Sequence, residues 1–376
     1  MPTYKIAFYL PNLDGGGAER VMLNLANGIA NLPDTEVDFA VAEKKGPLLD
    51  NFPKNVNLID LGSKRIATSV FPLSTYIRKS NPDVLVSALG TANIIAIAAN
   101  LLSFKKTKLI VTQHTTLSMS SPTHLRARLL PRLISLLYPC ADGRVAVSGG
   151  VADDLASVTG LKRNTIEVIY NPVITPDVQS LSLEPCLDKW ITDSTTPVLL
   201  GIGRLNPQKD FKTLLEAVSI INKKRPVKLI ILGEGELREE LEALIADLQL
   251  TEQVKMPGFV KNPYCYMRNA QLFVLSSLWE GLPTVLIEAL FCNTRLVSTD
   301  CPSGPKEILD DGRYGLLVKP GDPRELADGI MKTLDKTSTA NPIESWERYT
   351  LKYSTKHYLS YMFDNETSDR LTRRKS

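Results

Sequence analysis

Two glutamates lie within one short segment of the second half of the chain. Glu280 and Glu288 are separated by seven residues in the segment Ser277 to Ala289, which reads SLWEGLPTVLIEA. Pro283 suits the first turn of a helix, which places Glu288 in an otherwise apolar helix, although one glutamate could simply cap it. Burying an unpaired carboxylate is costly, so the pair is predicted to accept hydrogen bonds from sugar hydroxyls. Amides at the helix start would point at a phosphate, namely those of Gly281, Thr284 and Val285.

Two cations occupy the segment Gly201 to Asp210 (GIGRLNPQKD), which ends an apolar run and precedes a helical pattern. Arg204 offers paired planar donors and Lys209 offers a point charge, so both are predicted to converge on one diphosphate. The alternative is two ordinary surface cations. A cation near the positive start of a helix is electrostatically misplaced unless an anion joins it, which favours the diphosphate.

Two further candidates lie in the first half of the chain. The segment Gly15 to Arg20 (GGGAER) follows the first apolar run, and its bare amides at a helix start suit a phosphate or a hydroxyl-rich group. It lacks the G-x-G-x-x-G spacing, so a nicotinamide cofactor is poorly supported, and a tight turn is the alternative. His114 follows the apolar run Leu109 to Gln113 and is expected at the ligand-binding edge of a sheet, unless it is a structural residue.

In combination, these motifs resemble the retaining glycosyltransferases of family four, which have the GT-B architecture. The resemblance rests on Arg204 and Lys209, on the Glu280 and Glu288 pair with its Gly-Leu-Pro-Thr-Val interior, and on the Gly-Gly-Ala-Glu-Arg start. It covers nearly the whole chain. It implies an α/β fold of two Rossmann-like, doubly wound lobes that face each other across a cleft.

The resemblance also implies a role for each matching residue. Arg204 and Lys209 would bind the donor diphosphate, and His114 would lie near the reacting sugar. Glu280 would contact hydroxyls of the transferred sugar, and Glu288 would bind the ribose. The predicted catalytic group is therefore Glu280, His114, Arg204 and Lys209. The other donor-binding positions that the resemblance implies are Gly16, Gly17, Gly235, Phe259, Val260, Gly281, Leu282, Pro283, Thr284 and Val285.

The block Glu280 to Glu288 (EGLPTVLIE) is also similar to one in bacterial transferases that extend polyprenyl-diphosphate-linked oligosaccharides with N-acetylgalactosamine from a UDP donor. The same block occurs in transferases of other sugars. The resemblance implies a UDP-sugar donor, a glycan or polyprenyl-diphosphate-linked acceptor, and retention through front-face attack. Metal-using transferases often hold their cation with an Asp-x-Asp pair, and this sequence contains none. We therefore predict turnover without a metal or another cofactor, with Arg204, Lys209 and helix amides neutralising the leaving group.

A basic stretch of the first half is a candidate for binding the acceptor, because residues 84–141 contain no Asp or Glu. The predicted acceptor or membrane residues are Lys105, Lys106, Arg126, Arg128 and Arg132. The last three lie in the leucine-rich segment RARLLPRLISLLYP, which could rest on the inner face of the cytoplasmic membrane or bind a lipid diphosphate. A solvated helix packed on its sheet is the alternative, and Pro131 limits its regularity.

These motifs require a scaffold of two domains. The chain has 376 residues, of which 43% are apolar and 23% charged, as expected for a soluble globular protein. Its net charge of +3 is too small to indicate a nucleic-acid partner. Six β-rich runs alternate with helical patterns before residue 171, and six more follow from Val198 to Val318. We predict a first domain at 1–175, a linker at 176–196, a second domain at 197–342, and a C-terminal helix at 343–376 that returns to the first domain and ends in a basic tail from Arg370.

The uncharged stretch Val84 to Phe104 is interpreted as strand, turn and helix, because Gly90 and Thr91 interrupt it. The five cysteines are scattered, and no basic and apolar leader precedes the first strand, so a cytoplasmic location is expected.

Two alternative functions use similar lobes. A non-hydrolysing nucleotide-sugar epimerase has the same architecture, but the spacing of Glu280 and Glu288 argues against it. A non-catalytic, solute-binding protein would need secretion and no cations on the second domain's first loop. Hydrolase signatures and a P-loop are absent from the sequence.

Overall fold

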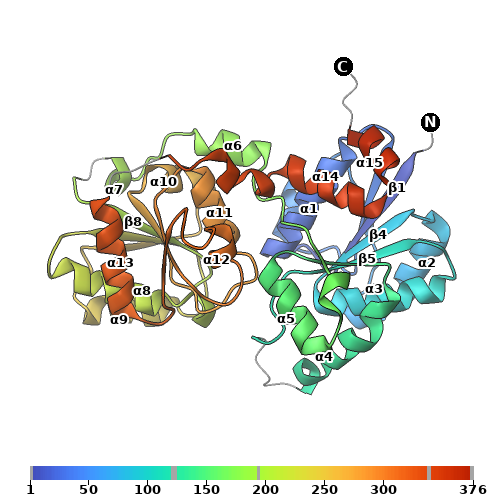
Figure 1. Ribbon diagram of the computed structural model, residues 1–376, viewed down its shortest axis with the longest axis horizontal. Helices are drawn as coiled ribbons and strands as arrows, with labels where there is room; N and C mark the ends of the chain where they lie inside the picture. Colours follow the sequence, from blue (N-terminus) through green and yellow to red (C-terminus); the bar gives the residue numbers. More distant parts are fainter. Residues whose placement is uncertain (1–2, 120–124, 193–194, 337–339, 373–376) are drawn as a thin grey trace. The chain divides into compact units, whose positions relative to one another are not determined.

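The computed structural model describes residues 3–119, 125–192, 195–336 and 340–372, and for residues 125–129 it describes the backbone alone. The chain divides into two compact units (Figure 1). The first lobe contains Met1–Pro172 and Tyr349–Ser376, and the second lobe contains Val173–Arg348. Each lobe is built around its own parallel sheet, so the predicted α/β class is confirmed.

Seven parallel strands form the sheet of the first lobe, in the order β3-β2-β1-β4-β5-β6-β7. They are β1 (Tyr4–Leu10), β2 (Thr35–Val41), β3 (Asn57–Asp60), β4 (Val84–Ala88), β5 (Lys108–Gln113), β6 (Gly143–Ala146) and β7 (Glu167–Val168). The six strands predicted from apolar runs are all present. The edge strand β3 was not predicted, because it has only two apolar residues, Leu58 and Ile59, and both are only partly buried.

Helices pack against this sheet and against one another. They are α1 (Gly17–Ala30), α2 (Val70–Ser80), α3 (Gly90–Ser103), α4 (Leu125–Leu137), α5 (Gly149–Thr159), α14 (Leu351–Met362) and α15 (Asn365–Thr372). Val21, Leu25 and Ile29 of α1 lie four residues apart and are buried in the core of the lobe. β4 and α3 account for the uncharged stretch 84–104 as predicted, and among the described residues no helix is long and apolar enough to cross a bilayer.

The end of the chain belongs to the first lobe. Helix α14 packs beside α1 (Figure 1), where a Cβ atom on Gly28 would lie only 2.8 Å from the Leu351 side chain. The basic tail that was predicted from Arg370 starts inside a helix, because Arg370 lies in α15 with its guanidinium 5.3 Å from the centre of the Tyr4 ring. The buried Leu371 anchors this last helix.

Six parallel strands form the sheet of the second lobe, in the order β10-β9-β8-β11-β12-β13. They are β8 (Val198–Ile202), β9 (Lys228–Leu232), β10 (Val254–Gly258), β11 (Leu272–Leu275), β12 (Leu296–Thr299) and β13 (Leu316–Val318). All six were predicted. The apolar side chains of the inner strands β9, β11 and β12 are buried, as expected for a parallel sheet that is covered by helices, whereas those of the edge strands β10 and β13 are partly exposed.

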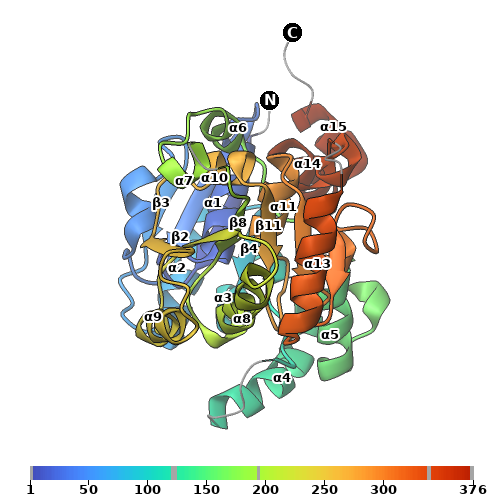
Figure 2. The same cartoon turned by 90° about the vertical axis from the view of Figure 1, so that its left-hand side faces the viewer.

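The helices of the second lobe include the segment that was predicted as a linker. They are α6 (Pro176–Ser182), α7 (Lys189–Thr192), α8 (Phe211–Asn222), α9 (Arg238–Asp247), α10 (Tyr264–Asn269), α11 (Thr284–Phe291), α12 (Pro305–Ile308) and α13 (Pro323–Asp335). Helices α8 and α13 lie side by side (Figures 1 and 2). Residues 176–192 fold onto this lobe, since the Asn262 amide donates to the Leu181 carbonyl at 2.9 Å and to the Glu184 carboxylate at 2.8 Å.

The strand orders place the loops that matter for binding. In each lobe the order reverses direction beside the first strand, which is β1 in the first lobe and β8 in the second. Ligands of such sheets bind at the carboxyl ends of the strands near this reversal. The relevant loops are those that follow β1 and β4 in the first lobe and those that follow β8 and β11 in the second.

Candidate active site

The loops after β8 and β11 bring Lys209 and Glu280 together. The Lys209 Nζ lies 2.6 Å from Oε1 of Glu280, and the Ser277 hydroxyl donates to the same oxygen at 2.6 Å. The other carboxylate oxygen, Oε2, receives a longer contact of 3.4 Å from the amide of Gln208. Glu280 is only 6% exposed, so these charged hydrogen bonds compensate for its burial.

The loop that carries Glu280 is fixed on both sides. On one side, the Leu278 amide donates to the Gln208 carbonyl at 2.8 Å, and the Ser276 hydroxyl donates to the Lys209 carbonyl at 2.8 Å. On the other side, the Glu280 amide donates to the Pro302 carbonyl at 3.0 Å. These bonds fix the backbone of both charged residues, so the carboxylate and the ammonium group are placed before any ligand binds.

Local sequence explains the shape of the loop after β8. The Asn206 side chain caps the short turn Pro207–Lys209 by accepting from the Lys209 amide. Asp210 then adopts a left-handed conformation with φ of +46° and caps α8 by accepting from the Thr213 amide. Asparagine and aspartate are the residue types that favour both roles, which explains how the polar stretch between β8 and α8 folds.

Glu288 lies in α11, where it is 9% exposed and accepts a hydrogen bond of 3.4 Å from the Tyr264 hydroxyl. Pro283 immediately precedes this helix, one residue earlier than its predicted place in the first turn, and its side chain provides no cap. The amides of Thr284 and Val285 therefore open the helix as predicted, at its positive end. Gly304, with φ of +95°, packs so closely against Pro283 that a side chain there would clash.

The three loops that follow β8, β9 and β10, at the carboxyl ends of these strands, are joined by backbone hydrogen bonds. The Gly233 amide donates to the Gly258 carbonyl at 2.9 Å, and the Leu205 amide donates to the Glu234 carbonyl at 2.9 Å. Gly233, with φ of +136°, and Gly235 approach the loop after β8 so closely that a Cβ atom on either would clash with backbone. The sequence alone gave no physical reason for these glycines, and the structure supplies one.

The residues predicted on the nucleoside side sit around these loops. Phe259 is 73% exposed directly after β10, and Val260 is half-buried. Arg238 holds Glu234 through two hydrogen bonds of 2.7 and 2.8 Å, and this pairing lowers the pKa of the Glu234 carboxyl. The exposed ring of Phe259 thus projects from a platform whose backbone is fixed.

Arg204 is not placed against Lys209. Its guanidinium lies 3.4 Å from the carboxylate of Glu236, and its side chain is 71% exposed. The two cations predicted to share one diphosphate are therefore paired with different carboxylates in the free protein. An exposed ion pair is weak, so Arg204 can leave Glu236 at little cost when an anion arrives.

In the first lobe, the glycine loop places an acidic group at the start of α1. Gly16 is extended and Gly17 begins the helix. The Glu19 carboxylate lies so close to Gly16 that any side chain at position 16 would displace it. Burial raises the pKa of this carboxyl, its own backbone amide opposes that shift, and nearby Asp14 adds to it. A carboxylate here accepts hydrogen bonds from hydroxyls and repels phosphate, which favours a hydroxyl-rich group at this loop.

His114 follows β5 directly, as predicted. Its Nε2 atom lies 3.0 Å from the Thr112 hydroxyl, and burial lowers the pKa of the ring to about 4. The imidazole is therefore neutral at pH 7, with one nitrogen that donates and one that accepts. A neutral ring can orient a hydroxyl but brings no positive charge to a diphosphate.

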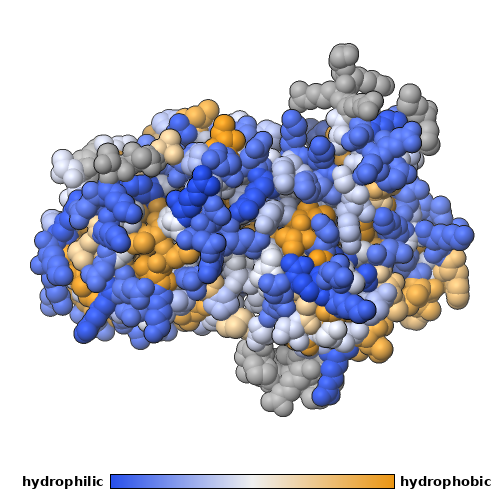
Figure 3. Space-filling view, in the orientation of Figure 1, coloured by the Kyte–Doolittle hydropathy of each residue, from blue (hydrophilic) through white to orange (hydrophobic). Residues whose placement is uncertain are grey.

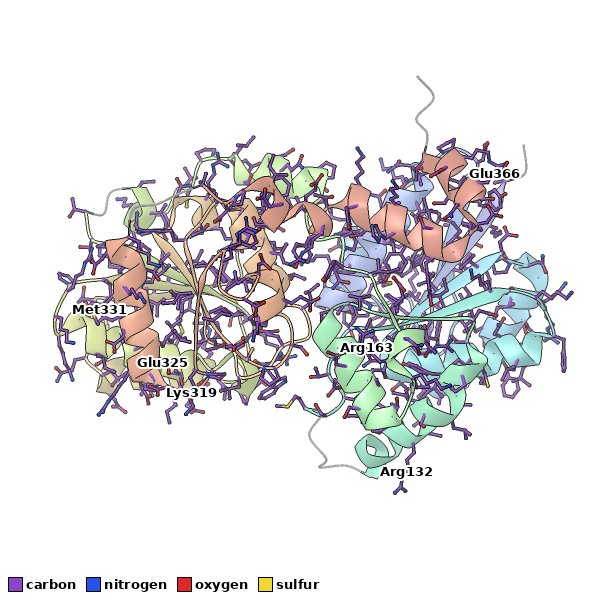
Figure 4. All side chains as sticks on the ribbon, in the orientation of Figure 1. Arg132, Arg163, Lys319, Glu325, Met331 and Glu366 are labelled. Carbon is purple, nitrogen blue, oxygen red and sulfur yellow. The ribbon has the colours of Figure 1, made fainter. Side chains whose placement is uncertain are left out.

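The predicted basic residues whose side chains the structure describes, Lys105, Lys106 and Arg132, do not form one patch. Lys105 and Lys106 lie in the loop before β5, at the edge where the strands of the sheet begin. Arg132 lies on α4 between Leu130 and Ile134, which flank Gly90 at the opposite edge (Figure 4). The side chains of Arg126 and Arg128 lie outside the described residues. The edge where the strands begin and the edge where they end are separated by strands of five or six residues, or about 15 to 20 Å. Lys105 and Arg132 therefore cannot bind the same lipid diphosphate.

Several residues of the second-lobe site were not predicted. They are Gln208, Tyr264, Ser277 and Gly304. Ser277 alone had a visible signal, because it stands three residues before Glu280 at the end of an apolar run. Within the part of the chain that the structure describes, no group of three or more His, Cys, Asp or Glu residues could hold a metal ion.

Two Rossmann-like lobes, with paired cations and carboxylates on the loops of the second, define a GT-B glycosyltransferase. Residues 15–175 match the family described as Glycosyltransferase Family 4, and residues 187–349 match Glycosyl transferases group 1. The chain belongs to the glycosyltransferases of family four, because it is 31% identical over 341 residues to a transferase of Campylobacter jejuni, covering 88% of this chain and 90% of the relative. This membership decides against the epimerase and the non-catalytic binding protein.

The relatives differ in what their names describe. The one from Campylobacter jejuni is an N-acetylgalactosamine-N,N'-diacetylbacillosaminyl-diphospho-undecaprenol 4-alpha-N-acetylgalactosaminyltransferase. A lipopolysaccharide 1,6-galactosyltransferase of Escherichia coli is 27% identical and covers 70% of this chain and 69% of its own. The crystal structure of Anabaena HepE with UDP and glucose has the same fold, with a TM-score of 0.76 and 21% identity over 96% of this chain and 99% of HepE.

Proposed function

We propose that this enzyme transfers a hexose or N-acetylhexosamine, with N-acetylgalactosamine as the first choice, from a UDP-sugar to a glycan on a polyprenyl diphosphate. The observation that carries the proposal is the cluster of Lys209, Glu280 and Ser277 at the carboxyl ends of β8 and β11. Support for the donor and acceptor comes from the name of the Campylobacter relative and from the UDP in the HepE structure. The product would enter a bacterial surface polysaccharide or a glycoprotein glycan.

In this proposal the two oxygens of Glu280 have different tasks. Oε1 is held by Lys209 and Ser277, whereas Oε2 has the long contact to Gln208 and accepts a hydroxyl of the transferred sugar. An ammonium group has three N–H donors, so Lys209 can keep Glu280 and still donate to the diphosphate. Glu288 accepts from the ribose hydroxyls, and Phe259 lies beside the uracil.

The reaction then needs charge neutralisation at the leaving group. The bond between the anomeric carbon and the diphosphate oxygen breaks, and its electron pair leaves with UDP. The acceptor hydroxyl forms the new bond on the same face, and its proton passes to a donor phosphate oxygen. Lys209, a re-oriented Arg204 and the first amides of α11 stabilise the developing charge, so we propose a retaining reaction that requires no metal.

The acceptor would meet the first lobe. The Glu19 carboxylate lies beside Gly16 and Gly17, which were predicted to bind the donor; in this proposal it offers acceptors for hydroxyls of the acceptor sugar, and the neutral His114 ring can orient the attacking hydroxyl. Since the acceptor is lipid-linked in the Campylobacter relative, we propose that the enzyme works in the cytoplasm, as a peripheral protein on the inner face of the membrane.

The first test is calorimetric titration of UDP, GDP and ADP into the purified protein with EDTA present. We expect UDP alone to bind, and Lys209→Ala to weaken it by about 1 to 3 kcal/mol, the value of a charged hydrogen bond. Lys212→Ala is the matched control, because Lys212 is an exposed residue of α8 close in sequence. If GDP or ADP binds instead of UDP, the donor carries guanine or adenine and the choice of a UDP-sugar is wrong. If no nucleotide binds, the proposal is contradicted.

A further inference from the structure

An exposed apolar corner stands out in the first lobe, at the end of α3. The side chains of Leu101, Leu102 and Phe104 are 56%, 42% and 89% exposed. Phe104 ends the helix in a left-handed conformation with φ of +54°, a position that favours glycine or asparagine. An aromatic residue here is both strained and exposed to water, which lowers the stability of the folded lobe. Apolar surface is visible over α2 and α3 in Figure 3.

Four cations lie at the same edge of the lobe as this corner. Lys105 and Lys106 follow Phe104 directly and are exposed, as are Arg78 and Lys79 in the last turn of α2. Helices α2 and α3 pack side by side. The loops that follow them are joined by hydrogen bonds from the Thr107 hydroxyl to the Pro82 carbonyl at 2.9 Å and from the Lys108 amide to the Asp83 carbonyl at 3.0 Å.

We propose that this corner, made of Arg78, Lys79, Leu101, Leu102, Phe104, Lys105 and Lys106, docks on an anionic lipid bilayer. The apolar side chains would enter the headgroup boundary while the four cations meet lipid phosphates. Charge complementarity decides the occupant, because a second copy of the chain would bring four like charges to the same face. The proposal deepens the proposed function, since it gives an enzyme with a lipid-linked acceptor a means to reach it.

The corner lies apart from the ligand-binding loops of the same lobe. It belongs to the edge where β4 and β5 begin, whereas His114 and the glycine loop lie where strands end. A bilayer at this corner therefore leaves those loops uncovered. The corner contains Lys105 and Lys106 of the five basic residues that the sequence predicted for the acceptor or the membrane, and it does not depend on Arg126, Arg128 or Arg132.

The test is sedimentation of the full-length protein with two kinds of vesicle, at low and high salt. One kind contains phosphatidylcholine alone, and the other contains phosphatidylglycerol and phosphatidylcholine in a 3:7 ratio. Phe104→Asn is the main variant, because asparagine tolerates the left-handed conformation and should keep the lobe folded. We expect it to lower partitioning onto anionic vesicles roughly tenfold, from the lost apolar contact. The double variant Lys105→Gln, Lys106→Gln should lower the partitioning onto anionic vesicles roughly thirtyfold. High salt should also lower the partitioning of the wild type, because it screens the cations.

Leu187→Asn is the matched control, since Leu187 is 88% exposed in the second lobe, and it should leave partitioning unchanged. Equal binding of the wild type to both vesicle types, no binding to either, or unchanged binding of Phe104→Asn would overturn the proposal. So would a concentration-dependent dimer in sedimentation velocity that Phe104→Asn makes monomeric, because the occupant would then be a second copy. UDP titration of each variant separates this result from the donor assignment, which depends on the second lobe alone.

Discussion

The ligand-binding loops of the two lobes are built differently. In the second lobe, Glu280 is held through both carboxylate oxygens and its own amide, and hydrogen bonds fix the loops before and after it. In the first lobe, the Glu19 carboxylate lies against Gly16 of the glycine loop, and among the described residues the His114 ring has one side-chain partner, the Thr112 hydroxyl. A site with many fixed partners suits one recurring ligand, whereas a sparse site can accommodate different ligands.

This contrast fits a division between a constant donor and a variable acceptor. Nucleotide and diphosphate groups demand charges at fixed positions, and Lys209 and Glu280 neutralise each other until such a ligand arrives. Sugar hydroxyls demand only acceptors and donors within reach, which Glu19 and a neutral His114 provide. Variants that affect nucleotide binding and sugar transfer differently test this division.

The largest effect is expected from Glu280→Gln. The amide keeps the size of the side chain but releases Lys209 from its ion pair, so UDP binding should tighten by about 1 kcal/mol or more. Transfer should fall by roughly 10² to 10³, because the carboxylate that we propose orients the sugar is lost. Calorimetry and initial rates with a UDP-sugar measure the two quantities. Glu236→Gln is the control, since it frees the exposed Arg204 and should reduce transfer little. Weaker UDP binding by Glu280→Gln would show that the ion pair organises the site rather than restraining it.

Which parts of this site the sequence could predict depends on how local their signal is. Strands with apolar runs, the cations after β8 and the two glutamates were all visible as local patterns. The Lys209–Glu280 ion pair was not, because it joins residues 71 apart and depends on β8 and β11 being neighbours in the sheet. The assignment of 176–196 as a linker took its prolines for loop residues, whereas Pro176 begins α6 behind the cap of Thr175.

The basic residues give the clearest case of what a sequence cannot resolve. Lys105, Lys106 and Arg132 lie in one stretch without acids, and all three were predicted to serve the acceptor or the membrane. A parallel strand carries the chain from one edge of the sheet to the other, and β5 lies between them. The exposed Phe104, in contrast, has no pattern that predicts its exposure or its left-handed backbone.

In the first lobe, the neutral state of His114 predicts a dependence of stability on pH. Its pKa is about 4 in the folded protein against 6.5 in the unfolded chain, so only the unfolded chain takes up the proton between these values. Stability should therefore fall as pH drops from about 6.5 to 4, by up to about 3 kcal/mol. Urea unfolding of the wild type and His114→Gln at both pH values measures this difference, which should disappear in the variant. The exposed His357 offers the control, His357→Gln, which should keep the wild-type dependence.

Ser277→Ala tests how far the second-lobe site depends on a partner that touches no ligand. The hydroxyl is fully buried and donates to Oε1 of Glu280, so its loss leaves the carboxylate held on that side by Lys209 alone. We expect a decrease in kcat/KM that corresponds to a loss of about 1.5 to 3 kcal/mol of transition-state stabilisation. The affinity for UDP should change by less than tenfold. Ser298→Ala is the matched control, because that buried serine donates to the Thr299 carbonyl of the same lobe and should change stability only. An equal loss of activity in both variants would mean that Ser277 serves the packing of the lobe, and the fixed geometry of Glu280 would then come from Lys209 and the backbone.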